Sequence, residues 1–248
     1  MDLSAFVPGI YPRSEALVQA TRDLDRGRTT QEAVDEQAAR DLDALLRAQE
    51  QAGVDLLADG MLAWHDLFRP LVEASAGLEL GPLTRFLDTN TFYRAAHAAG
   101  DAPRLERALD ERYVPRLPGP RLVTLPSPFA FAVASGVPQR ELAEGVLKPQ
   151  LDALADVDLV VLAEPFLARA SDPDVNGLGE ALAALAGGPP LALQVTFGDA
   201  GPLLDRLAEL PVDGLGIDFY ATSLEAVPER LDKLVLAGVV DGRGSLLE

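Results

Sequence analysis

Residues 159–165 read LVVLAEP, an apolar run from Leu159 to Ala163 that ends at once in Glu164 and Pro165. A short, continuous apolar run closed by a polar residue and a proline is typical of a strand buried on both faces, as in a parallel sheet. Similar runs recur along the chain, and the strands they predict are Leu3–Ile10, Val54–Ala58, Leu122–Leu125, Leu159–Ala163, Leu191–Val195, Gly214–Ile217 and Leu234–Val240, with extended chain also in Thr84–Tyr93.

The segments between these runs carry helix signals. Thr29 or Thr30 suits the N-cap of a long helix over Thr30–Ala52, and Gly53 suits its C-terminal stop. Pro149 is expected to end or kink another helix. That helix is predicted over Arg140–Ala155, and the others over Ser14–Asp25, Leu62–Ala74, Pro103–Leu109, Gly177–Ala186, Pro202–Leu210 and Leu224–Leu231, with a turn-rich break at Pro126–Pro128.

Strands that alternate with helices indicate a parallel sheet covered by helices. The chain has 248 residues, of which 48% are hydrophobic, enough for one large core. Since α/β barrels commonly run to about 250 residues as one unit, the sequence predicts a single (β/α)8 barrel domain over residues 1–248.

Charge and cysteine content exclude several classes of protein. The formal charge of -18 opposes binding to nucleic acid or to an anionic membrane surface, because both need clustered Lys and Arg. The chain has no cysteine, which removes disulfides, thiol nucleophiles and thiolate metal sites. No signal-peptide pattern follows Met1 and no apolar run reaches about 18 residues, so a cytoplasmic protein is expected.

Acidic residues follow the predicted strands. In a parallel barrel the carboxyl ends of all strands lie on the face that holds the active site, so these acids would converge on a pocket that binds a cation or an amino group or supplies a general base. The alternative is that each acid caps the helix that follows it. The catalytic candidates are Asp59, Glu164 and Asp218, and Asp241 is a binding candidate.

Several motifs, taken in order, resemble those of cobalamin-independent methionine synthases. Residues 9–13 (GIYPR) resemble the family's opening G-x-P-R, and 49–55 (QEQAGVD) resemble Q-x-x-A-G-[IV]-D. Residues 84–93 (TRFLDTNTFY) resemble T-K-W-F-D-T-N-Y-H-Y, and Glu164-Pro165 resembles the E-P of D-E-P-x-L. Later matches are 196–199 (TFGD), 210–218 (LPVDGLGID) and 237–243 (AGVVDGR), and together they span nearly the whole chain.

The resemblance implies a fold and an activity. Family enzymes have two barrels and transfer a methyl group from a methyl-folate to homocysteine, giving methionine. Their C-terminal barrel holds zinc through His, Cys, Glu and Cys, whereas the N-terminal barrel lacks the metal and helps bind the folate. The later motifs of this chain are most similar to the N-terminal barrel, so methyl-folate is expected as a substrate and a second catalytic barrel as a partner.

The chain departs from the family at the zinc ligands. Gln194-Val195-Thr196 stands where the catalytic barrel has H-x-C, and the late cysteine has no counterpart. No zinc cofactor is therefore expected. His65 and His97 are the only histidines; His65 follows the second predicted strand and is either a ligand-binding residue or the start of a helix.

The remaining candidates are polar residues near strand ends. The planar fork of Arg13 suits a carboxylate, such as the amino-acid end of homocysteine or a glutamate tail, and the alternative is a salt bridge to Asp59 or Asp241. The polar side chains of residues 88–93 either line the pocket or form hydrogen bonds within a loop. The predicted substrate-binding residues are Arg13, Tyr11, His65, Asp88, Asn90, Tyr93, Gln194, Asp241 and Arg243.

Three functions remain open at this point. The first is a methyltransferase of this family, and the second is a non-catalytic barrel that binds folate or an amino acid for a partner subunit. A decarboxylase related to uroporphyrinogen decarboxylase is the third, but it would need several arginines in the pocket, and only Arg13 and Arg243 are placed for that.

Overall fold

The computed structural model describes residues 3–240, and its centre is a sheet of five parallel strands in the order β5-β6-β7-β8-β9. The pairing is regular: Val161 lies opposite Thr124 on one side and Ala192 on the other. The sheet confirms the α/β prediction and the last four predicted strands of the chain almost to the residue. Its strands are β5 Leu122–Pro126, β6 Leu159–Glu164, β7 Leu191–Val195, β8 Gly214–Asp218 and β9 Leu234–Gly238.

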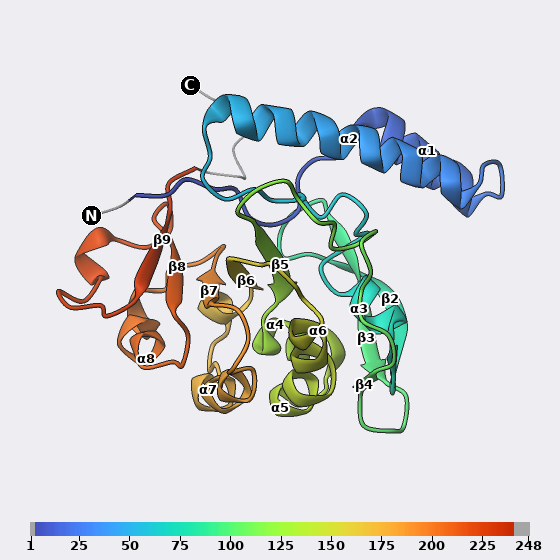
Figure 1. Ribbon diagram of the computed structural model, residues 1–248. Helices are drawn as coiled ribbons and strands as arrows, with labels where there is room; N and C mark the ends of the chain where they lie inside the picture. The colour runs from blue at the N-terminus through green and yellow to red at the C-terminus, as the bar shows by residue number, and fades with distance from the viewer. Residues whose placement is uncertain (1–2, 241–248) are drawn as a thin grey trace.

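The two faces of the sheet bury different sets of side chains. Leu162, Leu193 and Leu215 point into the main core, which the helices on that side cover (Figure 1). Val161 and Ala192 point the other way, into a smaller cluster that includes Phe6 and Leu56. The covering helices are α4 Pro128–Ser135, α5 Gln139–Leu142, α6 Lys148–Asp152, α7 Val175–Ala184 and α8 Leu204–Ala208.

The predicted eight-stranded barrel is not closed by hydrogen bonds within residues 3–240. The predicted strand at 54–58 contributes a single bridge, from Leu57 to Arg121, and the one at 3–10 is not a regular strand. Pro8 has no N–H to donate, and Gly9 turns the chain with a φ of +89°, so residues 3–10 cannot form a continuous ladder. The segment still lies beside residues 54–58, since the Asp55 N–H donates to the Ala5 carbonyl at 2.8 Å.

The two longest helices form an arm beside the sheet (Figure 1). They are α1 Glu15–Asp25 and α2 Gln31–Ala52, which confirm both predicted helices. Ser14 and Thr30 cap their N-termini, and Gly53 ends α2 in a left-handed conformation. Helices α1 and α2 bury Leu17, Val34 and Leu45 against Leu62, which fixes the arm to the rest of the chain.

Ser14 also joins the two helices of the arm. Its Oγ accepts a hydrogen bond from the Leu17 N–H at 3.1 Å and donates to Asp41 Oδ1 of α2 at 2.8 Å. Because Ser14→Ala removes both bonds, we expect it to lower the free energy of unfolding by about 1–2 kcal/mol. Urea unfolding followed by circular dichroism checks this, and an unchanged midpoint would show that neither bond matters.

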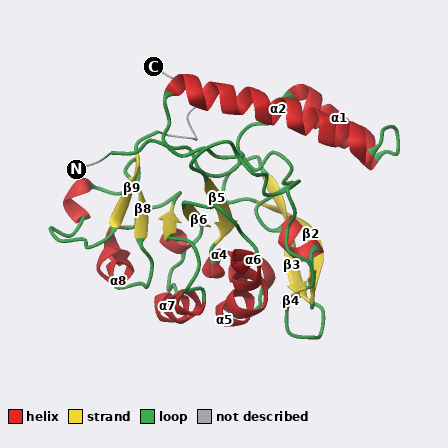
Figure 2. Ribbon diagram, viewed as in Figure 1, coloured by secondary structure: helices red, strands yellow, loops and turns green. Residues whose placement is uncertain are grey.

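The middle of the chain differs most from the prediction (Figure 2). Residues 103–109, predicted as a helix, contain strand β4 Arg104–Leu105, paired with β1 Ser75–Ala76. The predicted helices at 62–74 and 224–231 shrink to α3 Arg69–Glu73 and a single turn, Leu224–Ala226. Residues 84–93 belong to an antiparallel hairpin of β2 Leu78–Arg85 and β3 Phe92–Ala98. Short apolar stretches are ambiguous between helix and strand, and tertiary pairing decides them here.

The helix predicted over 140–155 does not end at Pro149. It consists of α5, a π-helical turn at Ala143–Leu147, and α6, which has the proline in its first turn and ends at Asp152. The π turn brings Gly145 against the backbone of β4, where a Cβ would lie 2.0 Å from the Pro103 carbonyl oxygen. In residues 3–240 no helix is both long and apolar enough to cross a membrane.

Candidate functional site

Glu164 lies at the carboxyl end of β6 and is fully buried. Its Oε1 accepts hydrogen bonds from the N–H groups of Phe166 at 2.9 Å and Leu167 at 2.8 Å, and Oε2 accepts one from the hydroxyl of Ser127. Burial raises the pKa of Glu164 to about 7, although these hydrogen bonds oppose the shift. The carboxyl group therefore holds the turn after β6 in place.

The other two acids proposed as catalytic are also engaged by backbone groups. Asp218, at the end of β8, accepts from the N–H groups of Phe197 at 3.3 Å and Tyr220 at 3.0 Å. Asp59 accepts from the Met61 N–H at 3.1 Å, and burial raises its pKa to about 6. Gln194, on β7, is half-buried on the face opposite the main core. Of the three acids, only Glu164 accepts at the start of a helical turn, Leu167–Arg169, as the helix-cap alternative requires.

The hairpin residues lie in different environments. Tyr93 is buried among aromatic rings, with its centroid 5.4 Å from that of Phe68. Asp88 and Asn90 are exposed near the hairpin's turn, where Asp88 Oδ1 lies 3.6 Å from Arg169 Nη1. The structure thus separates three residues that the sequence places within one short motif.

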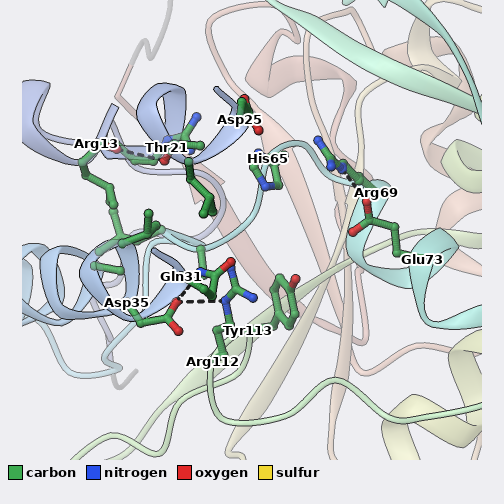
Figure 3. A pocket seen from close by; sticks show the side chains of 16 residues that line it. Arg13, Thr21, Asp25, Gln31, Asp35, His65, Arg69, Glu73, Arg112 and Tyr113 are labelled. Atoms are coloured by element: carbon green, nitrogen blue, oxygen red, sulfur yellow. Dashed lines mark hydrogen bonds and ion pairs between the residues drawn. The ribbon is translucent and has the colours of Figure 1, made fainter. Parts of the chain in front are cut away.

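A cavity of about 190 Å³ brings Arg13 and His65 together, between the arm and α3 (Figure 3). Arg13 enters from the segment before α1, and His65 from the loop before α3. The aliphatic part of the wall comes from the arm and includes Leu17 and Val34. The charged groups that line it are Arg13, Asp25, Asp35, Arg69, Glu73 and Arg112.

The charges in this cavity are unevenly paired. Arg69 Nε lies 2.7 Å from Glu73 Oε1, and Arg112 Nε lies 3.2 Å from Asp35 Oδ1. Arg13 has no carboxylate within 4.0 Å among residues 3–240, although burial lowers the pKa of its guanidinium. Of the three arginines, Arg13 is therefore the one open to a bound anion. Of the alternative salt bridges, the one to Asp59 is not formed, and the one to Asp241 falls outside the described residues.

The surroundings of His65 favour its neutral form. Burial lowers the pKa of its imidazole, and the positive charges of Arg69 and Arg13 lower it further. Glu73 and Asp25 act in the opposite direction without cancelling the shift.

Tyr11 lies away from this cavity, at a second one of about 190 Å³ between residues 7–11 and the C-terminal half of α2. Its N–H donates to the Gly60 carbonyl at 2.9 Å, and its side chain is exposed. Glu164, Asp59 and Asp218 line neither cavity. Asp241 and Arg243 lie outside the described residues.

The donor groups do not fit the family's zinc site. Between residues 3 and 240 no cluster of three His, Cys, Asp or Glu side chains is arranged to hold a metal ion. His65 lies in the cavity, whereas His97 is exposed on β3 with its Nε2 3.5 Å from Glu79 Oε2. With no cysteine in the chain, the ligand set of that site cannot be assembled.

Sequence reasoning missed most of the cavity. The Arg69 and Glu73 pair is visible as an i,i+4 spacing, but that spacing is equally typical of a solvated helix face. Arg112 and Asp35 carry no local signal, because only the packing of the arm brings them together. Ser127, which binds Glu164, was read as part of a turn.

Comparison with known sequences decides the family. Residues 146–245 match the N-terminal domain of cobalamin-independent synthases. The 5-methyltetrahydropteroyltriglutamate–homocysteine methyltransferase of Mycobacterium tuberculosis H37Rv is 29% identical over 95% of this chain. The chain belongs to the cobalamin-independent methionine synthase N-terminal domain family. It spans about 37% of the length of the mycobacterial relative. A second relative of the same name, from Mycolicibacterium paratuberculosis, is 31% identical over 72% of this chain and 27% of its own length.

Solved structures support the same fold. A B12-independent methionine synthase from Shewanella, crystallised with selenomethionine, superposes with a TM-score of 0.63 over 85% of this chain and 72% of that one, at 16% identity. A synthase from Listeria monocytogenes gives the same TM-score over 84% and 70%, at 15% identity. The chain therefore shares the α/β fold of these synthases.

Proposed function

We propose that this chain is a ligand-binding member of the methionine synthase family, which holds a methyl-folate or homocysteine by a carboxylate for a partner that carries out methyl transfer. The proposal takes residues 1–248 as one domain of barrel type, acting in the cytoplasm. Its main support is the cavity arginine Arg13, which is half-buried and open to an anion while its neighbours Arg69 and Arg112 are ion-paired.

The chemistry of the ligand follows from that arginine. A guanidinium presents a planar fork of N–H donors that matches the two oxygens of a carboxylate. The ligand named by the relatives, a pteroyltriglutamate, carries several carboxylates, and homocysteine carries one. In a chain with a formal charge of -18, such ligands require a local cationic group, and the guanidinium of Arg13 is one.

The test is the affinity of Arg13 variants. We expect 5-methyltetrahydropteroyltriglutamate to bind the wild-type chain, and Arg13→Ala to weaken binding by about 10- to 100-fold, the value of a hydrogen bond to a charged group. Arg140→Ala is the matched control, since Arg140 is an exposed residue of α5 and pairs with Glu144 at 2.7 Å. If calorimetry showed the same loss of affinity in both variants, Arg13 would not be part of the binding site.

Methyl transfer by this chain itself is the second candidate. It is favoured by the name that the relatives share, methyltransferase, and by the extent of the match, which covers 95% of this chain. The absence of the family's zinc ligands opposes it. Formation of methionine from homocysteine and the methyl-folate by the purified chain would support it.

A further inference from the structure

We propose that His65 takes up a proton when a carboxylate ligand occupies the Arg13 cavity, so that binding tightens as the pH falls. The inference rests on the proposed function, because it concerns the regulation of that same site. It assigns His65 a ligand-linked role that goes beyond lining the wall.

Geometry places His65 among charges that nearly balance. It shares one cavity of about 190 Å³ with Arg13 and with two arginines that already have carboxylate partners (Figure 3). The titratable and charged groups that face this cavity are Arg13 from the segment before α1, Asp25 of α1, Asp35 of α2, Arg69 and Glu73 of α3, and Arg112 and Tyr113 from the loop before β5.

The direction of the effect follows from these charges. Burial and the positive charges of Arg69 and Arg13 keep the pKa of His65 below its ordinary value. A carboxylate on Arg13 adds one negative charge to the cavity, and this charge offsets the positive charge of Arg13. The change favours the imidazolium, so the pKa of His65 rises on binding.

Linkage turns this rise into a pH dependence of affinity. Since the bound state holds the proton more tightly than the free state, affinity increases as the pH falls through the two pKa values, by at most tenfold per pH unit for one proton. Between pH 8 and pH 6 we expect the affinity of the wild-type chain for 5-methyltetrahydropteroyltriglutamate to rise, and to rise less in His65→Gln. The ligand's carboxylates do not contribute, because carboxyl groups titrate near 4.3 and stay ionised over this range.

Calorimetry in buffers of low and high ionisation enthalpy measures the protons taken up directly. We expect a fraction of one proton per ligand at pH 7 for the wild-type chain and for His97→Gln, and none for His65→Gln. His97 is the matched control, as the second of the two histidines and an exposed residue of β3.

A second readout does not depend on a variant at the site. With two histidines, the wild-type chain gives two imidazole Cε1–H resonances in NMR, and His97→Gln assigns them. Saturation with ligand at pH 7 should move the His65 resonance toward its protonated position and leave that of His97 in place. If the ligand binds without proton uptake and the His65 resonance does not move, the inference about His65 is wrong while the proposed function stands. Absence of binding at every pH defeats the proposed function and this inference with it.

Discussion

Phe68→Ala is expected to lower the free energy of unfolding by about 3–5 kcal/mol, the usual loss for a fully buried aromatic side chain. Phe68 is 0% exposed, and its ring centroid lies 5.4 Å from that of Tyr93 and 5.8 Å from that of Phe131. It also stacks on Phe166, which follows β6, at 6.4 Å. One ring therefore joins the hairpin, the helix after β5 and the loop after β6, and its removal leaves a cavity at their junction.

The control for that loss is another phenylalanine in the same region. Phe92 of β3 is 47% exposed, with Arg85 above its ring at 5.8 Å, so Phe92→Ala should cost under about 1 kcal/mol. Chemical denaturation of both variants measures the difference. Equal losses would show that Phe68 does not hold the three segments together.

Glu164→Gln is expected to change how stability depends on pH. The pKa of Glu164 rises from 4.5 in the unfolded chain to about 7 in the folded one, because of its burial. The folded state thus binds the proton more tightly, so the stability contributed by this group is complete below pH 4.5 and is lost as the pH rises to about 7. The shift corresponds to about 3 kcal/mol.

Unfolding free energies at pH 5, 6, 7 and 8 test this. The wild-type chain should lose about 3 kcal/mol more than Glu164→Gln does across that range. Gln can still accept from the N–H groups of Phe166 and Leu167, so the variant is expected to fold. Asp59, whose pKa is raised to about 6, gives a smaller trend of the same sign in both proteins. If the unfolding free energies of the wild-type chain and of Glu164→Gln changed with pH in parallel, the pKa of Glu164 would not be raised in the folded state.

The sequence predicts the second half of the chain well and the first half poorly, for a physical reason. Strands β6 to β9 are short apolar runs separated by helices, so local pattern and tertiary structure agree. In the first half only α1 and α2 carry clear caps. The hairpin of β2 and β3 depends on cross-strand pairing, and the predicted strand at 3–10 is interrupted by Pro8 and Gly9.

The candidate site shows the same limit. Arg13 and His65 were predicted as binding residues from their positions near strand ends, and the structure brings both to one cavity. Arg112, from a loop far along the chain, was not predicted, because only the arm formed by α1 and α2 brings Asp35 to it. The acids at the strand ends, by contrast, carry a strong sequence pattern but are engaged by backbone N–H groups.

We propose that this chain binds its ligand without the zinc chemistry of the family's catalytic barrel. Titration of homocysteine and of 5-methyltetrahydropteroyltriglutamate into metal-quantified protein, with and without added zinc, tests it most directly. We predict that at least one of these ligands binds with the same affinity in the presence and absence of zinc, and that no methionine forms. Homocysteine binding that requires zinc, with methionine formed on addition of the methyl-folate, would contradict the account.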